Sequence, residues 1–270
     1  MLNQTANKHS ETTAEPPVAL VTGGGTGIGA ACAEAFARQG IRVAVNFNSS
    51  ADSAQNVVAV CEKYDVDALA VQGNVSDDAD CRDIMSCVER RWGRLDMLIN
   101  NAGVTRFAEA SDLDALSDKD FQEIFAVNVT GAYQMIRAAS SLLNRSTNAS
   151  VVNISSHSGF SGIGSSTAYA ASKGALNTLT RAMALAMAPR VRVNAVCPGF
   201  VDTDWMAKKL DEESLTHFKD KVAKIAPLKQ VVTPDQVAEA VLWFALGGKT
   251  ITGQLLVIDG GTHLTVGNPI

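Results

Sequence analysis

Residues 18–29 read VALVTGGGTGIG, a short β-branched run followed by a glycine-rich turn and the start of a helical pattern. Five glycines fall within residues 23–29, more than a tight strand-to-helix turn requires. Glycines let backbone amides approach a pyrophosphate, which then lies at the positive end of the helix dipole. The spacing T-G-x-x-x-G-x-G differs from the usual dinucleotide fingerprint G-x-G-x-x-G. The segment therefore predicts a strand–helix unit that binds a nucleotide.

Downstream, short β-branched runs alternate with longer helical patterns. The expected strands are 18–22, 41–47, 68–72, 97–100, 151–154, 191–196 and 255–258. The expected helices are 28–39, 51–64, 77–92, 118–143, 168–188 and 234–246. Strands separated by crossover helices form a parallel sheet covered on both faces. We therefore expect a doubly wound α/β Rossmann fold with a seven-stranded parallel sheet, and ligands at the carboxyl ends of its strands.

Two segments lie outside this alternation. Residues 1–17 are polar and end in two prolines, which predicts a disordered N-terminal tail before a single domain at 18–270. Residues 200–227 are polar and helical, and they belong to no strand–helix unit. Their apolar side chains are Trp205, Met206, Leu210 and Phe218. We expect this segment to be a flap over the site.

Composition excludes several classes of function. The formal net charge of −5 argues against a surface that binds nucleic acid. The five cysteines are odd in number and form no C-x-x-C pair. No stretch approaches the roughly 20 apolar residues of a membrane helix. We expect a soluble, cytoplasmic protein with no nucleic-acid or membrane partner and no metal.

Tyr169 and Lys173 are spaced i,i+4, which places both side chains on one face of a helix. An ammonium about 4 Å from the phenol would favour phenolate by roughly 4 kcal/mol, or about three pKa units. That shift would bring the tyrosine towards neutrality, where general acid–base catalysis is most efficient. Alone, the pair is more typical of an ordinary surface helix than of a catalytic site.

Several separate motifs accompany that pair. They are T-G-x-x-x-G-I-G at 22–29, N-N-A-G at 100–103, F-A-V-N-V-T-G around 128, N-I-S-S at 153–156, Y-A-A-S-K at 169–173, P-G-F-V-D-T at 198–203 and D-G-G at 259–261. Together they resemble the short-chain dehydrogenase/reductase family over nearly the whole chain. Within the family, the chain is similar to 3-oxoacyl-carrier-protein reductases and glucose-dehydrogenase-like members.

The resemblance implies four catalytic residues. Tyr169 would be the acid/base, and Lys173 would lower its pKa and bond the nicotinamide ribose. Ser156 would donate a hydrogen bond to the substrate carbonyl; Ser155 is the alternative, but only Ser156 precedes Tyr169 by the family's thirteen residues. Asn128 would hold a water that relays protons, or would be a buried amide that satisfies backbone groups in a helix bend.

The resemblance also implies cofactor contacts. Those expected along the chain are Gly23, Gly25, Thr26, Gly27, Ile28, Asn46, Asn48, Asn74, Val75, Asn101, Ala102, Gly103, Tyr169, Lys173, Pro198, Gly199, Val201 and Thr203. Asn74 is a departure, since many members carry aspartate there. No carboxylate occurs in 46–50 to repel a 2′-phosphate, although the only nearby arginine, Arg42, lies at the wrong end of the strand. We expect NADP(H) to be favoured over NAD(H).

These expectations describe an oxidoreductase that interconverts a ketone and a secondary alcohol. The substrate would be a small carbonyl compound or a carrier-linked acyl chain, and the resemblance implies a homotetramer. A catalytically silent nucleotide sensor or scaffold is the alternative, and a dehydratase or epimerase is a third. His157 is either a proton-transfer group or part of the pocket wall. Trp205 and Phe160 either line the pocket or dock the flap.

Overall fold

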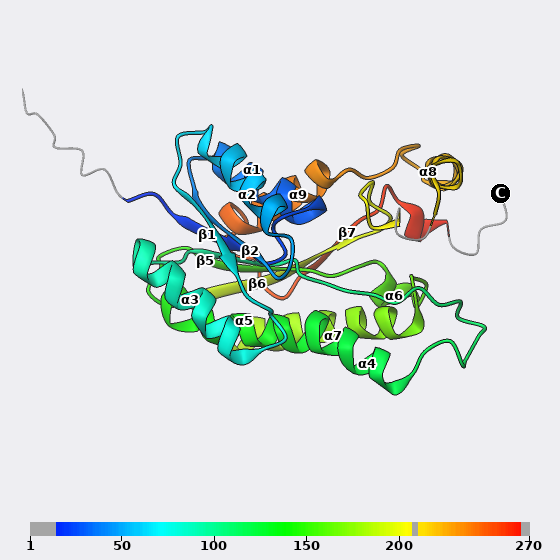
Figure 1. Cartoon of the computed structure of the whole chain (residues 1–270), viewed down its shortest axis with the longest axis horizontal. Coiled ribbons are helices and arrows are strands. Elements are labelled where there is room, and N and C mark those ends of the chain that lie inside the picture. Colours follow the sequence, from blue (N-terminus) through cyan, green and yellow to red (C-terminus); the bar gives the residue numbers. More distant parts are fainter. Residues whose placement is uncertain (1–14, 207–209, 266–270) are drawn as a thin grey trace, which may run out of the picture.

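The computed structural model describes residues 15–206 and 210–265 (Figure 1). Most of the predicted tail, and residues 207–209 of the predicted flap, lie outside these ranges. The described strands form one parallel sheet of seven in the order β3-β2-β1-β4-β5-β6-β7. They are β1 (Val18–Val21), β2 (Arg42–Phe47), β3 (Ala68–Gln72), β4 (Met97–Asn100), β5 (Ala149–Ile154), β6 (Val191–Pro198) and β7 (Leu255–Ile258). The predicted fold class and all seven predicted strands are confirmed.

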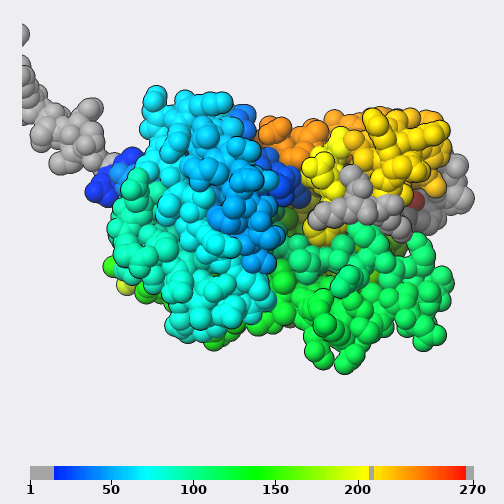
Figure 2. Space-filling view, in the orientation of Figure 1, coloured from blue at the N-terminus to red at the C-terminus, as the bar shows by residue number. Residues whose placement is uncertain are grey.

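Helices cover both faces of the sheet (Figure 1). On one face lie α1 (Gly27–Arg38), α2 (Ala51–Glu62) and α9 (Pro234–Leu246). On the other lie α3 (Asp78–Trp92), α4 (Asp118–Phe125), α5 (Ala132–Leu143) and α7 (Thr167–Ala186). The remaining described α-helices are α6 (Ser158–Ser161) and α8 (Glu212–Ile225). Figure 2 shows the α8 segment at the same end of the molecule as the green segments that follow β4 and β5.

Each helical layer closes its own apolar core. Phe36 of α1 and Phe244 of α9 pack in the core on one face. Ile84 of α3 and Met135 of α5 pack in the core on the other. Strands such as β1 are buried along their whole length, as continuous apolar runs in parallel sheets require. The sheet is therefore a rigid support for the loops at its carboxyl edge.

Three local features differ from the sequence prediction. The single helix expected at 118–143 is interrupted by a π-helix, Ala126–Gly131, between α4 and α5. The short helix α6 follows β5 and was not expected. The polar segment expected to be helical between 200 and 227 forms α8 only from Glu212. No helix in the described part of the chain is long and apolar enough to cross a membrane.

Candidate active site

The predicted site residues gather at the carboxyl edge of the sheet, where β1 and β4 are neighbours although far apart in sequence. Ligands bind at such a switch point in doubly wound folds. Thr22 Oγ1 accepts hydrogen bonds from the backbone amides of Asn101 and Ala102, both at 3.0 Å. The Asn101 side chain donates to the carbonyls of Thr22 and Gly23, both at 2.9 Å. Asn101 thus joins the glycine loop to the end of β4.

The glycine loop is shaped to let a ligand approach its backbone. A Cβ at Gly25 would lie 3.2 Å from the Ala54 amide nitrogen, and Gly27 has a positive φ of 53°. Thr26 is the N-cap of α1, but its side chain makes no capping hydrogen bond and the first turn has no acidic residue. By contrast, the N-cap side chain of α3 accepts capping hydrogen bonds, and acidic residues lie in the first turn of that helix. The positive end of α1 is therefore uncompensated by the protein, as a site for a pyrophosphate requires. The loop fits a dinucleotide.

At the end of β2, the two predicted asparagines differ. Asn46 is buried, and its amide nitrogen donates to the carbonyls of Gly73 (2.9 Å) and Val71 (3.3 Å). Its oxygen accepts from the Gly23 amide at 3.4 Å. The amide nitrogen of Asn46 is thus used within the protein, and its predicted contact with the cofactor stays a prediction. Asn48 is exposed and lies where such a contact is feasible.

Asn74 and Val75, predicted to contact adenine, follow β3. The Asn74 side-chain oxygen accepts hydrogen bonds from the amide and hydroxyl of Ser76, at 3.1 and 2.8 Å. Its backbone amide donates to Asp80 at 2.8 Å. The Val75 carbonyl accepts from Gln134 at 2.9 Å. These bonds fix the turn, and the adenine contact itself stays a prediction.

The structure brings Tyr169 and Ser156 together. Ser166 caps α7 by accepting a hydrogen bond from the Tyr169 amide at 3.2 Å, which sets the tyrosine in the first turns of the helix. The Tyr169 phenol is hydrogen-bonded to Ser156. Burial raises the pKa of Tyr169 to about 12, while the hydrogen bond with Ser156 lowers it in part. The phenol is therefore protonated at neutral pH.

Lys173 lies beneath this pair and is almost fully buried. Its Nζ donates to the Ile154 carbonyl at 2.8 Å. Burial lowers the pKa of Lys173 to about 8. In this structure burial outweighs any lowering of the Tyr169 pKa by Lys173, because both groups lose hydration. Desolvation disfavours the charged form of each.

Asn128 lies in the π-helix, where the hydrogen-bonding pattern of a regular helix is broken. Its amide nitrogen donates to the Val104 carbonyl and to Ser172 Oγ, both at 3.0 Å. Its oxygen accepts from the Val104 amide at 2.8 Å. The side chain thus satisfies backbone groups beside a helix irregularity, as one of the two interpretations predicted. A proton relay through Asn128 stays a prediction.

Two loops form a wall beside the tyrosine. Thr105 Oγ1 and Ser165 Oγ are 2.6 Å apart, and the Ala108 amide donates to the Ser165 carbonyl at 3.0 Å. Trp205 from the flap approaches the tyrosine, with its ring centroid 6.1 Å from that of Tyr169. Trp205 thus packs beside the tyrosine ring, and its role in lining the pocket stays a prediction. Phe160 is half exposed.

The flap also packs on the segment that follows β6. Phe218 of α8 meets Phe200 edge to face, with ring centroids 4.9 Å apart. Lys219 pairs with Asp202 at 2.5 Å. Helix α8 is thus docked on the segment that follows Pro198, the last residue of β6.

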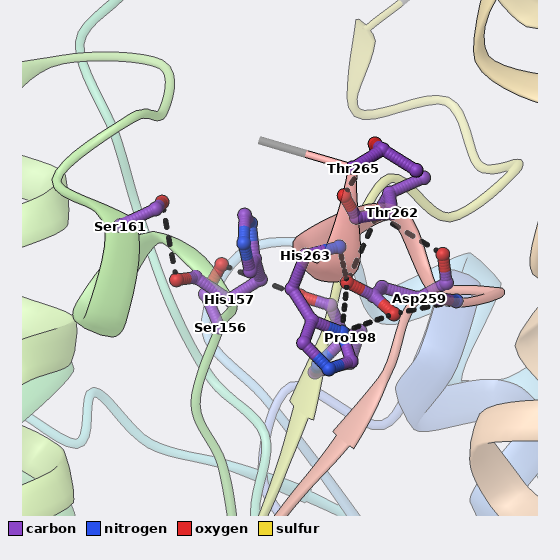
Figure 3. Close-up of polar contacts among 9 residues, drawn as sticks. Ser156, His157, Ser161, Pro198, Asp259, Thr262, His263 and Thr265 are labelled. Atoms are coloured by element: carbon purple, nitrogen blue, oxygen red, sulfur yellow. Dashed lines mark hydrogen bonds and ion pairs between the residues drawn. The ribbon is translucent and has the colours of Figure 1, made fainter. Parts of the chain in front are cut away.

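A cluster around Pro198 joins the residue before α6 to the turn after β7 (Figure 3). The Pro198 carbonyl accepts from the His157 amide at 2.8 Å. A Cβ at Gly199 would lie 2.6 Å from Asp259 Cβ, so only glycine fits there. Thr203 Cγ2 lies 3.4 Å from the Cβ position of Gly27, which brings the predicted nicotinamide loop to the glycine loop.

Asp259 is buried and holds the turn after β7. Its carboxylate accepts hydrogen bonds from the Gly261 amide, Thr262 Oγ1 and the His263 amide, at 2.8 to 2.9 Å. It also pairs with His263 Nδ1 at 2.9 Å. Sequence reasoning missed this pairing; the i,i+4 spacing of aspartate and histidine after D-G-G was the available signal.

Within residues 15–206 and 210–265, no cluster of three or more histidine, cysteine or acidic side chains could hold a metal ion. In this part of the chain the candidate site brings together one phenol, one amine, several hydroxyls and the glycine loop.

Comparisons with known proteins agree with this geometry. A family model described as enoyl-(acyl carrier protein) reductase matches residues 23–263. A Streptomyces violaceoruber protein named as a ketoacyl reductase of granaticin polyketide synthase is 41% identical, covering 93% of this chain and 97% of its own length. A 3-oxoacyl-[acyl-carrier-protein] reductase of Synechocystis is 34% identical, covering 90% and 96%.

A solved structure named as a short-chain dehydrogenase/reductase from Burkholderia xenovorans superposes with a TM-score of 0.87 at 40% identity. The superposition covers 93% of this chain and 99% of the other. The fold and site define an oxidoreductase of the Rossmann class. The chain belongs to the short-chain dehydrogenase/reductase family.

Proposed function

We propose that this protein interconverts a ketone and a secondary alcohol with NADP(H). The observation that carries the proposal is the Tyr169 phenol, protonated and hydrogen-bonded to Ser156 at the edge of the sheet that also bears the glycine loop. One hydroxyl can polarise a carbonyl oxygen while the other delivers a proton to it.

When bound, a nicotinamide nucleotide supplies the hydride that adds to the carbonyl carbon. Ser156 donates a hydrogen bond to the carbonyl oxygen, where negative charge develops. Tyr169 transfers its proton to that oxygen, which completes the alcohol. The Lys173 ammonium, fixed by the Ile154 carbonyl, stabilises the resulting phenolate. In the direction of oxidation each transfer is reversed.

The preference for NADP(H) is supported by the end of β2. Residues 46–50 carry no carboxylate to repel a 2′-phosphate, and Asn48 is exposed there. Ser50, the N-cap of α2, makes no capping hydrogen bond with its side chain. Asp52 lies in the first turn of α2, so the exposed neutral side chains of residues 48–50, and not the helix N-terminus, are the groups that would meet a phosphate.

The names of the relatives support a carbonyl as the reacting group. Two are named as ketoacyl or 3-oxoacyl reductases, whereas the family model is described as an enoyl reductase. A Ser156–Tyr169 pair places its hydrogen bonds on an oxygen, which favours a ketone over an isolated carbon–carbon double bond. The substrate is a small carbonyl compound or a carrier-linked acyl chain.

The direct test is nucleotide oxidation by the wild type and by Tyr169→Phe across a panel of ketones and enones. The wild type should consume NADPH with ketones, and the variant should lose about 10² to 10⁴-fold in kcat while its Kd for NADP⁺ is retained. Full activity in Tyr169→Phe would refute the mechanism. A wild type that binds nucleotide but consumes none would favour the silent sensor, and product formed without nucleotide consumption would favour a dehydratase or epimerase.

We also propose that the protein is cytoplasmic and forms a homotetramer. Leu185 of α7 is 83% exposed and Tyr133 of α5 is 40% exposed, so the layer that carries the catalytic helix presents apolar side chains to solvent. Light scattering should give four copies of the chain. A monomer at micromolar concentration would contradict this.

A further inference from the structure

His157 follows Ser156 directly and begins the turn that leads into α6. Its backbone is held from both sides. The amide donates to the Pro198 carbonyl at 2.8 Å, and the carbonyl accepts from the Phe160 amide at 2.9 Å. The position of the His157 Cα, from which the side chain extends, is therefore fixed relative to the Ser156 hydroxyl.

The imidazole of His157 is half-buried, yet it has no hydrogen-bond partner in the described part of the chain. Figure 3 shows the ring between α6 and the 3-10 helix Thr262–Leu264, with no dashed line reaching it. An imidazole carries at least one N–H donor in either charge state. The ring is partly exposed, so its N–H is accessible to a ligand as well as to water.

The polar groups near His157 are already paired. Ser156 Oγ and Ser158 Oγ are 3.1 Å apart and bonded to each other. Thr262 Oγ1 and His263 Nδ1 are both committed to Asp259. Within residues 15–206 and 210–265, the His157 ring is thus a donor without a protein partner that directly follows the serine, on the side of the Pro198–Gly199 loop.

We propose that His157 determines substrate specificity by donating a hydrogen bond to a second acceptor oxygen of the substrate. This inference rests on the proposed function, because the first oxygen is the ketone bound by Ser156. The class of substrate that fits is a 1,3-dicarbonyl compound, such as a 3-oxo ester or thioester. Its second carbonyl is one methylene away from the reacting one. Proton transfer remains with Tyr169, so His157 takes no part in the chemical step.

The test compares two substrates of equal chain length, ethyl 3-oxohexanoate and nonan-4-one, which differ in the second carbonyl and the ester oxygen. Both are assayed by NADPH oxidation with the wild type, His157→Phe and His157→Gln. Phenylalanine keeps a flat ring without donors, and glutamine keeps a donor. Thermal unfolding of each variant checks the fold.

His157→Phe should lose about tenfold in kcat/KM for the dicarbonyl compound, the scale of one lost hydrogen bond, mostly through KM. Its kcat/KM for nonan-4-one should be unchanged. His157→Gln should keep most of the wild type's preference, in kcat/KM, for the dicarbonyl compound over nonan-4-one. Equal losses of kcat/KM for both substrates, or no loss for either, would overturn the role proposed for His157. The proposed function would still stand if both substrates were turned over. A wild type that reduced neither substrate nor any ketone of the panel would overturn both.

Discussion

Lys173 Nζ lies 5.5 Å from the centre of the Tyr169 ring, while its hydrogen bond goes to the Ile154 carbonyl at 2.8 Å. The amine is therefore close enough to stabilise a phenolate, but it is held by the backbone of β5. Burial separates the two pKa values in opposite directions, to about 12 for the phenol and about 8 for the amine. The resting pair thus favours a neutral phenol, the form that donates a proton.

The buried amine should cost stability at neutral pH. Its pKa falls from 10.5 unfolded to about 8 folded, which corresponds to about 3 kcal/mol. Between those values the unfolded chain binds more protons, so stability rises with pH through that window, and the full cost is present below pH 8. Lys173→Met should therefore raise the free energy of unfolding at pH 7 by roughly 1–3 kcal/mol, after loss of one hydrogen bond, and abolish activity.

Urea unfolding at pH 7 and pH 10 measures this effect. The advantage of Lys173→Met should shrink at the higher pH, because the wild-type amine is then mostly neutral in the fold. Lys63→Met, at an exposed position after α2, is the matched control and should change little. A Lys173→Met protein less stable than the wild type at pH 7 would contradict the calculation.

Alcohol oxidation and ketone reduction should respond differently to pH. Oxidation needs the phenolate, and a phenol with a pKa of about 12 is almost wholly protonated below pH 9. The rate of oxidation should rise about tenfold per pH unit between pH 6 and pH 9, whereas reduction should stay nearly flat below pH 8. A carbinol-deuterated alcohol checks that hydride transfer limits the rate. A pH-independent rate of oxidation showing a full isotope effect would be inconsistent with this picture.

The glycine loop should tolerate no side chain at position 29. A Cβ there would lie 2.3 Å from the Gly23 carbonyl oxygen and 2.5 Å from Asn101 Nδ2. Gly29→Ala should lower the free energy of unfolding by about 1–3 kcal/mol and weaken nucleotide binding. Gly174→Ala is the control: its Cβ meets nothing closer than 3.5 Å, and alanine within α7 should stabilise by about 0.5–1 kcal/mol. Denaturation curves and fluorescence titration with NADPH measure both effects.

Nucleotide preference should depend on charge at the end of β2. Asn48→Asp places a carboxylate beside the expected 2′-phosphate and should reduce kcat/KM for NADPH at least about tenfold relative to NADH. Asn46→Asp should instead destabilise the fold, since the buried amide donates to Gly73 and Val71. Steady-state kinetics with both nucleotides decide the matter. If Asn48→Asp left the ratio of kcat/KM for NADPH to that for NADH unchanged, the 2′-phosphate would bind away from residue 48.

Much of the fold could be predicted because its signals are local. β-Branched runs gave all seven strands, and the α1 loop is recognisable from its glycines alone. The break in the helix expected at 118–143 could not be predicted, because the π-helix accompanies contacts of Asn128 with Val104 and Ser172, which are distant in sequence. A helical period carries no information about such distant partners.

For the site, the sequence by itself determined which groups are present and that Tyr169 and Lys173 share a helix face, since i,i+4 spacing is a property of the helix. Only the tertiary structure decided their protonation, because desolvation depends on the packing of β5, α7 and the flap around them. It likewise decided that the Asn46 side-chain amide donates to backbone carbonyls. It also decided that Asp259 packs against Gly199, sixty residues away. Hydration and hydrogen-bond partners are set by neighbours in space, which a linear pattern does not record.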